Sequence, residues 1–376
     1  MRTRERWAYL IRTPKIALAA VALGRYSFTY DWMPVTVRGM SCRSRRNLLC
    51  AGLNLLYRRA RPWNWPLHMQ IELTSYCNLR CPVCPVGTRD LARGPVAIDV
   101  GRFESLMSEV GPYLLTLSLW AWGEPLLHPD LDEILGITRR YPAATLLSTN
   151  GQNLDQARIL EALEKNPPTY LIVAVDGLCD ETNSLYRRGA RLAPLLEGVE
   201  ALADWKRRTG SRLPVLHCRF LAMKHNEHEI PELRDFAGRH GFEMVSIRGL
   251  SIIDSSDEAH TALLTEDERW RAYAYRKGLR VRRDDFICQH PFSFPTVLAD
   301  GTVVACEQDF NGSRAFGSFS SDRSFRSIWF SPEAAAIRRV IRQDPNQFSF
   351  CSRCPYVDRE GSSCSLEAYV LRPIRI

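Results

Sequence analysis

The sequence predicts an α/β protein: a partial (β/α)6 barrel of the TIM type, followed by a small C-terminal module made of a β-hairpin and helices. Two observations predict this fold. Six β/α units follow one another between residues 68 and 250, and their strands are short apolar runs rather than alternating ones, as parallel strands covered by helices require. Right-handed crossovers would curl such strands into a barrel or part of one. After residue 250 the alternation stops, and "FSFPTVLADGTVVACEQD" predicts a hairpin that turns at Asp300 and Gly301.

Composition divides the chain into four parts. Of the 376 residues, 45% are hydrophobic and 24% charged, which is ordinary for a globular protein. The net charge of +8 comes from the N-terminus, because residues 1–62 contain 13 Lys and Arg against two acids, Glu5 and Asp31. We therefore expect a basic amphipathic extension (1–65), a core domain (66–250), a helical linker (251–285) and the C-terminal module (286–376).

The N-terminal extension contains a predicted amphipathic helix. In "RSRRNLLCAGLNLLYRRARP" the apolar residues recur at helical spacing, namely Leu48, Leu49, Leu53, Leu56 and Tyr57. Two interpretations stay open: the helix packs on the neighbouring domain, or it lies on anionic lipid with its Arg residues at the phosphates. The second predicts a peripheral membrane contact through residues 1–62. No nucleic-acid motif is present, and no nucleic-acid partner is expected.

The twelve cysteines are clustered rather than spread as a disulfide framework would be. No secretory signal is evident, and the apolar run "IALAAVALG" is too short to span a bilayer as a helix. A reducing compartment is therefore expected, where clustered cysteines more often bind metal than pair with one another. The predicted location is the cytoplasm, with the option of a peripheral position at the inner membrane surface.

Distinctive segments follow the predicted strands: a cysteine triad, "WGEP", "STNG", "VDG" and "MKHN". In a parallel barrel these segments open onto one rim, which predicts a single active site there. The triad is Cys77, Cys81 and Cys84. A structural zinc site needs four ligands, and no fourth is close in sequence. Three thiolates on a [4Fe–4S] cluster leave one iron open for a chelating ligand, so we favour iron–sulfur, with zinc or free thiols as the alternative.

The triad at the end of a first strand resembles the CxxxCxxC signature of radical S-adenosylmethionine (SAM) enzymes, and the resemblance covers about residues 68–250. "WGEP" is similar to the family's GGEP, although Trp122 replaces its first glycine. The resemblance implies a SAM-binding [4Fe–4S] cluster on the triad, and SAM itself. The residues it assigns to SAM are Val83, Gly123, Glu124, Ser148, Asn150, Asp176 and Arg187.

Several of these roles have simpler alternatives. Glu124 suits the SAM ammonium and Arg187 the SAM carboxylate. Val83 either covers the adenine or is a packing residue, and Asp176 either contacts SAM or only forms the turn before Gly177.

A second cysteine set lies in the C-terminal module: Cys288, Cys306, Cys351 and Cys354. Taken alone it suits a zinc ribbon or an iron–sulfur cluster equally. Its spacing resembles the Twitch module, a shortened relative of SPASM domains, which implies one auxiliary [4Fe–4S] cluster. Cys364 is then spare, as an open-site ligand, a hydrogen-atom donor or an inert thiol.

Substrate-side residues are harder to identify. Period-2 alternation along "LHCRFLAM" directs Cys218 outward if His217 and Arg219 point into the barrel. His217, Arg219 and Cys364 are the candidate catalytic residues; for the first two, a charge satisfied within the barrel is the alternative.

The resemblance implies reductive cleavage of SAM to a 5′-deoxyadenosyl radical that abstracts a substrate hydrogen. With an auxiliary cluster to transfer electrons, we expect oxidation or epimerisation of a small carbohydrate-like or amphiphilic metabolite, with flavodoxin or ferredoxin as electron donor. The alternatives are a maturase of a ribosomal peptide and a non-catalytic iron–sulfur or zinc-binding scaffold. The complete triad and strand-end motifs argue against the scaffold.

Overall fold

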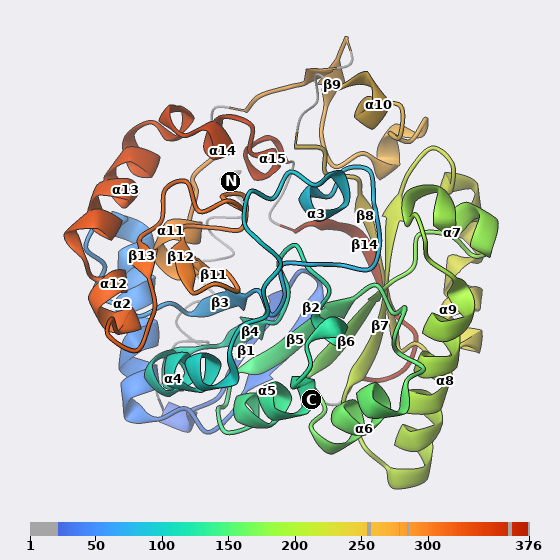
Figure 1. The fold of residues 1–376 in the computed structure, drawn as a ribbon, viewed down its shortest axis with the longest axis horizontal. Helices are drawn as coiled ribbons and strands as arrows, with labels where there is room; N and C mark the ends of the chain where they lie inside the picture. The colour runs from blue at the N-terminus through green and yellow to red at the C-terminus, as the bar shows by residue number, and fades with distance from the viewer. Residues whose placement is uncertain (1–21, 254–256, 278, 284–285, 360–362, 375–376) are drawn as a thin grey trace.

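The computed structural model describes residues 22–253, 257–277, 279–283, 286–359 and 363–374. Residues 1–21 of the basic extension lie outside these ranges. A ten-stranded sheet forms the centre (Figure 1). Six of its strands run parallel in sequence order: β3 (His68–Ile71), β4 (Thr116–Ser118), β5 (Ala144–Thr149), β6 (Tyr170–Ala174), β7 (Val215–Ala222) and β8 (Met244–Gly249). The predicted α/β fold with a parallel, partly closed barrel is confirmed.

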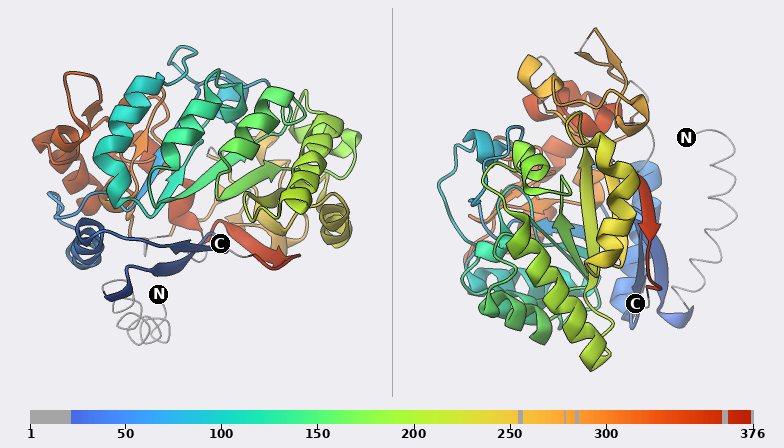
Figure 2. Two further views of the ribbon diagram at one scale, coloured as in Figure 1. Left: turned by 90° about the horizontal axis from the view of Figure 1, so that it is seen from below. Right: turned by 90° about the vertical axis from the view of Figure 1, so that its right-hand side faces the viewer.

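Helices cover one face of this sheet (Figure 2). They are α4 (Val100–Val110), α5 (Leu131–Thr138), α6 (Ala157–Lys165), α7 (Asp180–Tyr186), α8 (Leu192–Thr209) and α9 (Leu233–Arg239), while the single-turn helix α3 (Pro85–Thr88) lies in the loop after β3. Helix α4 shows why they form: the side chain of Asp99 caps its first turn by accepting from the Arg102 amide. Its apolar residues Phe103, Leu106 and Val110 are fully buried, each contributing roughly 1.5–3 kcal/mol.

The C-terminal module continues the same sheet at both edges. Strand β11 (Thr296–Val297) pairs in parallel with β3 and leads through the predicted hairpin to β12 (Thr302–Val304) and β13 (Gly317–Ser318). Gly301 takes a φ of +92° at the turn, which glycine adopts without strain. At the other edge, β14 (Ser365–Val370) is antiparallel to β8. The module's helices are α11 (His290–Ser293), α12 (Phe325–Trp329), α13 (Pro332–Gln343), α14 (Ser349–Ser352) and α15 (Pro355–Asp358).

An N-terminal hairpin, which the sequence did not lead us to expect, lies on the face of the sheet opposite the helices (Figure 2). It consists of β1 (Tyr26–Tyr30) and β2 (Met33–Val37). Asp31 and Trp32 form its two-residue turn, both with positive φ. Met33 and other buried residues of β2 join an apolar cluster with side chains from the parallel strands. The hairpin therefore closes one side of the barrel interior.

The amphipathic helix of the extension forms as α2 (Cys42–Tyr57), and half-buried Leu48 packs against the apolar cluster beneath it. The residues that it buries are small or polar: Ser44, Asn47, Ala51 and Asn54. Asn47 exchanges hydrogen bonds with the backbone of Trp65, which explains why a polar face docks. Leu49, Leu53, Leu56 and Tyr57 instead face outward and are 47–77% exposed.

The expectation of a helical linker over residues 251–285 is wrong for its described part. It contains only the short helix α10 (Glu258–Thr261), a 3₁₀ turn (Glu268–Trp270) and the two-stranded ribbon β9 (Tyr275–Arg276) and β10 (Leu279–Arg280). Trp270 and Tyr273 are buried, so the segment packs closely on the domain instead of forming a free helix. Of the helices that the structure describes, none is both long and apolar enough to cross a membrane.

Candidate iron–sulfur and SAM site

The cysteine triad occupies the loop after β3, and α3 begins directly after Cys84. Two close contacts shape this loop. The Cys84 amide donates to the carbonyl of Cys81 at 3.3 Å, and Arg80 donates to the carbonyl of Arg188 at 3.1 Å. A Cβ atom on Gly87 would lie 2.2 Å from the Cys81 carbonyl oxygen, so only glycine fits there. Sequence reasoning missed Gly87, whose role depends on how the loop folds back.

The three sulfur atoms are half-buried and surrounded by few compensating charges. Burial, with a smaller effect from Glu124, raises the pKa of Cys77 to about 12. Burial also raises the pKa of Cys81 to about 11, although Arg187 opposes the shift. Such thiols stay protonated at neutral pH unless a metal replaces the proton. The Leu79 amide and the Asn150 side chain point N–H groups at the Cys77 sulfur, at 3.4 and 3.5 Å, which favours a thiolate there. The triad therefore fits a bound cluster.

The "WGEP" segment lies beside this loop. A Cβ atom on Gly123 would lie 1.8 Å from the Thr74 carbonyl oxygen, so glycine is required. The Glu124 carboxylate accepts from the Thr149 hydroxyl at 2.7 Å and from the amides of Asn150 and Leu126 at 2.8 and 3.0 Å. Both carboxylate oxygens of Glu124 thus accept hydrogen bonds within the chain. Glu124 joins the end of β4 to the end of β5.

The other predicted SAM residues gather at the same ends of the strands. Asn150 donates to Asn78 at 2.8 Å, which places "STNG" against the cysteine loop, and Ser148 is half-buried on β5. Buried Asp176 accepts from the Leu221 amide at 2.8 Å and forms an ion pair with Arg187 at 2.7 Å.

These contacts bear on the two roles that the sequence left open for Asp176, a contact to SAM or only a turn, and for Val83, a cover for the adenine or a packing residue. Burial alone would lower the pKa of Arg187, but Asp176 and Cys81 outweigh it and raise that pKa. Asp176 thus does more than form a turn: it holds the Arg187 guanidinium near two cysteines. Val83 packs with Cys81 against a small apolar cluster that includes Tyr186 and Met223.

The candidate catalytic residues are not part of this loop. His217 bonds to Ser246 at 2.8 Å, and Arg219 lies 3.6 Å from Asp31 in the hairpin turn. Cys218 is buried in the main core that the helices share, as the alternation predicts. The sequence carried one signal for Asp31, which is one of two acids in a strongly basic segment.

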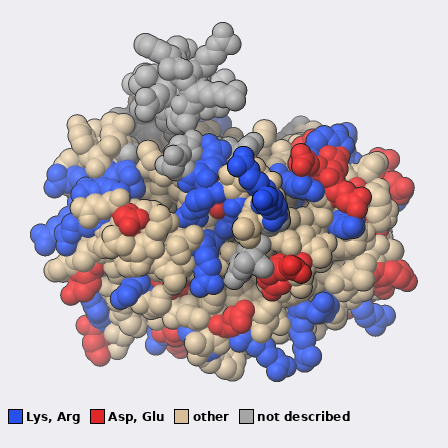
Figure 3. Space-filling model, turned by 90° about the horizontal axis from the view of Figure 1, so that it is seen from above, with Lys and Arg blue, Asp and Glu red and all other residues tan. Residues whose placement is uncertain are grey.

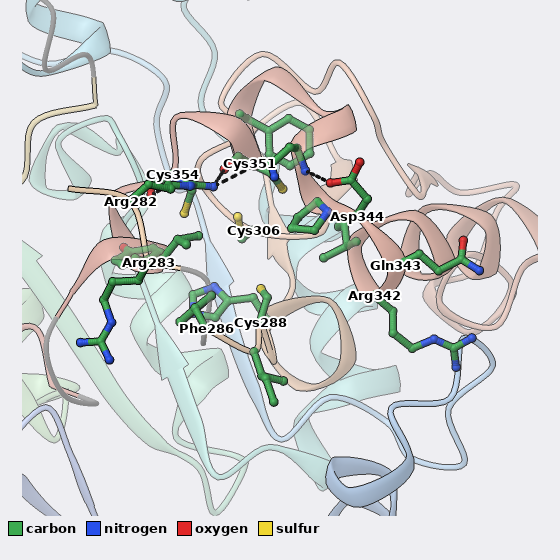
Figure 4. Close-up of a pocket in the computed structure, with 18 of the residues that line it drawn as sticks. Arg282, Arg283, Phe286, Cys288, Cys306, Arg342, Gln343, Asp344, Cys351 and Cys354 are labelled. Atoms are coloured by element: carbon green, nitrogen blue, oxygen red, sulfur yellow. Dashed lines mark hydrogen bonds between the residues drawn. The ribbon is translucent and has the colours of Figure 1, made fainter. Parts of the chain in front are cut away.

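The second cysteine set surrounds a cavity of about 670 Å³ in the C-terminal module (Figure 4). Cys288, Cys306, Cys351 and Cys354 come from three separate stretches and direct their sulfur atoms toward a common space. Burial raises the pKa of Cys288 to about 12 and that of Cys354 to about 11. Throughout the described ranges, no group of three or more His, Cys, Asp or Glu side chains is arranged to hold a metal ion. The sulfur atoms line a space instead, which suits a larger group.

Arginines bind the backbone of this set. Arg282 donates to the carbonyls of Cys351 and Cys354, at 2.8 and 3.2 Å, and Arg58 donates to that of Cys288 at 3.3 Å. Arg58 near Cys288, and Arg282 near Cys351 and Cys354, partly oppose the rise in pKa that burial causes in these three thiols. Cys364 does not line the cavity and instead contacts the Arg359 guanidinium.

Family models match two segments of the chain. Residues 71–237 match the Radical SAM superfamily, and residues 288–355 match SPASM, an iron–sulfur cluster-binding domain. The second match contains all four cysteines of the C-terminal set. The two matched segments together make up more than half of the chain.

Three curated relatives illustrate the similarity. PqqA peptide cyclase of Gluconobacter oxydans is 26% identical over 184 residues, which cover 48% of this chain and 49% of that protein. GTP 3′,8-cyclase of Paenarthrobacter nicotinovorans is 31% identical, with 52% and 53% covered. Mycofactocin maturase MftC of Mycobacterium ulcerans is 21% identical over 320 residues, with 80% and 83% covered. The chain spans only about half to three-fifths of the first relatives that it matches.

Solved structures share the fold. Streptococcus suis SuiB bound to S-adenosylmethionine superposes with a TM-score of 0.58 at 15% identity, covering 88% of this chain and 79% of that one. Native anSMEcpe with bound AdoMet and the Kp18Cys peptide gives 0.53 at 14% identity, with 80% and 94% covered. Residues 71–237 are therefore a radical SAM domain and residues 288–355 a SPASM domain, and the two domains imply that the chain binds [4Fe–4S] clusters and SAM.

Proposed function

We propose that this protein is a radical SAM maturase that modifies a ribosomally made peptide. One observation carries the proposal: the similarity to the mycofactocin maturase MftC extends over 80% of the chain, well beyond the radical SAM domain alone. A second relative is named a peptide cyclase. These names favour a peptide over the carbohydrate-like metabolite expected from the sequence, which becomes the second candidate.

The proposed roles in the first site follow its geometry. Cys77, Cys81 and Cys84 hold a cluster with one open iron. When bound, the cluster and SAM supply a 5′-deoxyadenosyl radical. Gly123 brings the "WGEP" backbone close to the cysteine loop, and Asp176 fixes the Arg187 guanidinium, whose charge suits a carboxylate.

The C-terminal set is proposed to bind one auxiliary [4Fe–4S] cluster through Cys288, Cys306, Cys351 and Cys354. Four thiolates close its coordination, which suits electron transfer more than substrate ligation. The two sites are also connected, because Trp122 of "WGEP" donates from its indole to the carbonyl of Glu307, directly after Cys306. A flavodoxin or ferredoxin is the proposed electron donor.

Residues 22–63 are further proposed to contact an anionic membrane surface. The α2 surface, defined as Leu49, Leu53, Leu56, Tyr57 and Trp63, is exposed although apolar. Exposed arginines lie beside it, and the Arg59 guanidinium stacks 4.3 Å from the centroid of the Trp63 ring. Apolar side chains with aromatic and cationic neighbours match the boundary between lipid tails and phosphates. Figure 3 shows Lys and Arg interspersed with Asp and Glu over the face that it draws, so basic charge alone does not identify the α2 surface.

Deuterium transfer tests the substrate class. Cells of the source organism are grown with deuterated amino acids, and the small-molecule and peptide fraction of their extract is added to the reconstituted protein with SAM and dithionite. The radical takes hydrogen from its substrate, so 5′-deoxyadenosine acquires deuterium, which mass spectrometry detects. The proposal predicts transfer that disappears when the fraction is first treated with protease. The Cys81→Ala variant serves as the blank.

Transfer that survives protease treatment, or that occurs only from extracts labelled through deuterated glucose, would overturn the peptide assignment in favour of a small metabolite. Absence of any 5′-deoxyadenosine from protein with intact clusters would instead favour the non-catalytic scaffold.

A further inference from the structure

A charged cluster is buried in the barrel interior, where strands β7 and β8 meet the N-terminal hairpin. It consists of Arg219, Arg248 and Asp31. The Asp31 carboxylate forms ion pairs with both guanidinium groups, and its Oδ1 accepts from the Ser363 hydroxyl and the Ser365 amide at 2.7 and 2.8 Å. The side chains of Arg219 and Asp31 are more than nine-tenths buried. The cluster is therefore a built feature rather than a surface ion pair.

The positive charge in this cluster exceeds the negative charge. Asp31 supplies one carboxylate against two guanidinium groups. The neighbouring side chains do not correct the difference: Arg359, which contacts Cys364, adds one positive charge, and Glu307, which accepts from the Tyr356 hydroxyl, adds one negative charge. One positive charge thus remains in a buried place, where an uncompensated charge is costly. The imbalance calls for one more anion.

Two donors in the cluster also lack partners. Within the described residues, the Nε–H groups of Arg219 and Arg248 are buried without a hydrogen bond, as is the Nδ1 atom of nearby His217, which donates or accepts according to its tautomer. The contact of Arg219 with Asp31 is 3.6 Å long, beyond a good hydrogen bond. Leaving a buried donor unpaired costs about 1–3 kcal/mol, and more for a charged one. A ligand with acceptor oxygens would satisfy the arginines.

The cluster lies between the two cofactor sites. Arg248 pairs in register with Leu221, whose amide donates to Asp176 of the SAM site. On the other side, the electrostatic neighbours of Arg248 include Tyr356, which lies two residues after Cys354 of the C-terminal cysteine set. A substrate attacked by a radical formed at the SAM site would occupy this interior.

We propose that Arg219 and Arg248 bind a carboxylate of the substrate, with Asp31 as a positioning residue that orients both guanidinium groups. This inference rests on the proposed function and narrows its substrate to one that carries a carboxylate. A monoanion matches the single excess charge, whereas a phosphate dianion would exceed it. The planar guanidinium fork is complementary to a carboxylate.

Ligand-induced thermal stabilisation of the reconstituted full-length protein, with SAM bound, tests the proposal. The probes are glutarate, acetyl-Ala-Glu-Ala-amide, acetyl-Ala-Gln-Ala-amide and inorganic phosphate, all at constant ionic strength. Glutarate represents a free carboxylate metabolite and the Glu peptide an acidic side chain. We expect glutarate or the Glu peptide to raise the unfolding temperature of wild type in a saturable way. The Gln peptide should have no such effect.

Variants of Arg219 are compared with a variant of an exposed arginine by their apparent affinity for the carboxylate probe. Arg219→Gln should weaken the apparent affinity for the carboxylate probe at least tenfold, and Arg219→Lys, which keeps the charge but loses the fork, should give an intermediate value. Arg207→Gln, an exposed arginine on α8, should behave as wild type. If Arg219→Gln fails to fold, Arg248→Lys provides the same test, with retained iron as the check of folding.

Three outcomes would overturn the proposal: stabilisation by phosphate alone, equal stabilisation of wild type and Arg219→Gln, or no saturable effect of either carboxylate probe on wild type. Formation of 5′-deoxyadenosine is measured in matched samples to which dithionite has been added as the electron donor. Its absence from wild type would count against the proposed function, while carboxylate binding that depends on Arg219 would still support the anion site.

Discussion

Trp122 donates a hydrogen bond from its indole Nε1 to the carbonyl oxygen of Glu307, at 2.7 Å. The contact joins the "WGEP" segment to the residue after Cys306, so the SAM site and the C-terminal cysteine set are held together directly. Trp122 replaces the first glycine of the GGEP motif that the sequence resembles. Its carbonyl also lies 3.9 Å from the sulfur atom of Cys84.

Replacing Trp122 with phenylalanine removes the donor but keeps a ring to pack against Phe310. The Glu307 carbonyl then lacks its partner, and we expect a loss of about 1–2 kcal/mol in stability. Thermal unfolding of the reconstituted protein should show a decrease of a few degrees. Trp205→Phe, in a half-buried position on α8, is the control, and an equal decrease in both variants would contradict a specific link between the sites.

Gly123→Ala should disrupt the SAM site. The added methyl group would meet the Thr74 carbonyl at 1.8 Å, which requires the loop to move and displaces Glu124. We expect SAM affinity, measured by calorimetry, to fall at least tenfold. Gly94→Ala has open space around its added methyl group and should bind as wild type. Normal SAM binding by Gly123→Ala would show that this close approach is not needed.

The raised pKa values of the triad predict slow alkylation in the metal-free protein. With pKa values of about 12 for Cys77 and about 11 for Cys81, few thiolates exist at pH 8. Because iodoacetamide reacts with the thiolate, the rate at each cysteine should rise about tenfold per pH unit until the pH approaches that pKa. Peptide mass spectrometry resolves the sites. A rate that is already at its plateau at pH 8 would contradict the burial effect.

The α2 surface should mediate lipid binding. Leu53→Gln combined with Leu56→Gln removes apolar area from residues that are 51% and 77% exposed, so folding should be unaffected. Co-sedimentation with vesicles containing about one-third phosphatidylserine should fall severalfold, and neutral vesicles should bind weakly. Leu185→Gln, an equally exposed leucine on α7, is the control. Unchanged sedimentation of the double variant would contradict a role of the α2 surface in lipid binding.

Much of the core was predictable because local and tertiary preferences agree there. Each parallel strand is a short apolar run, and the motif after it lies at the same rim, so Cys77, Gly123, Asn150 and Asp176 come together as expected. Helix α4 combines a capping Asp99 with apolar residues at helical spacing. In such segments one pattern decides both the element and its buried face.

The rest depends on contacts that no local pattern encodes. The polar face of α2 docks because Asn47 exchanges hydrogen bonds with the backbone of Trp65, so the hydrophobic pattern alone could not decide which face packs on the domain. The turn at Asp31 lacks glycine, and the partners of Asp31 lie more than 180 residues away, on β7 and β8. The hydrogen-bond donors to the Glu124 carboxylate come from the end of a different strand, so the sequence around Glu124 did not indicate them.

The central claim is that the triad holds a [4Fe–4S] cluster whose open iron binds SAM. Its most direct test is electron–nuclear double resonance on the dithionite-reduced protein with SAM labelled with ¹⁷O in its carboxylate. We predict a hyperfine coupling between the cluster and the label, retained in Cys179→Ala, an exposed cysteine, and absent in Cys81→Ala. A reduced triad cluster with no coupling to bound SAM would contradict the account.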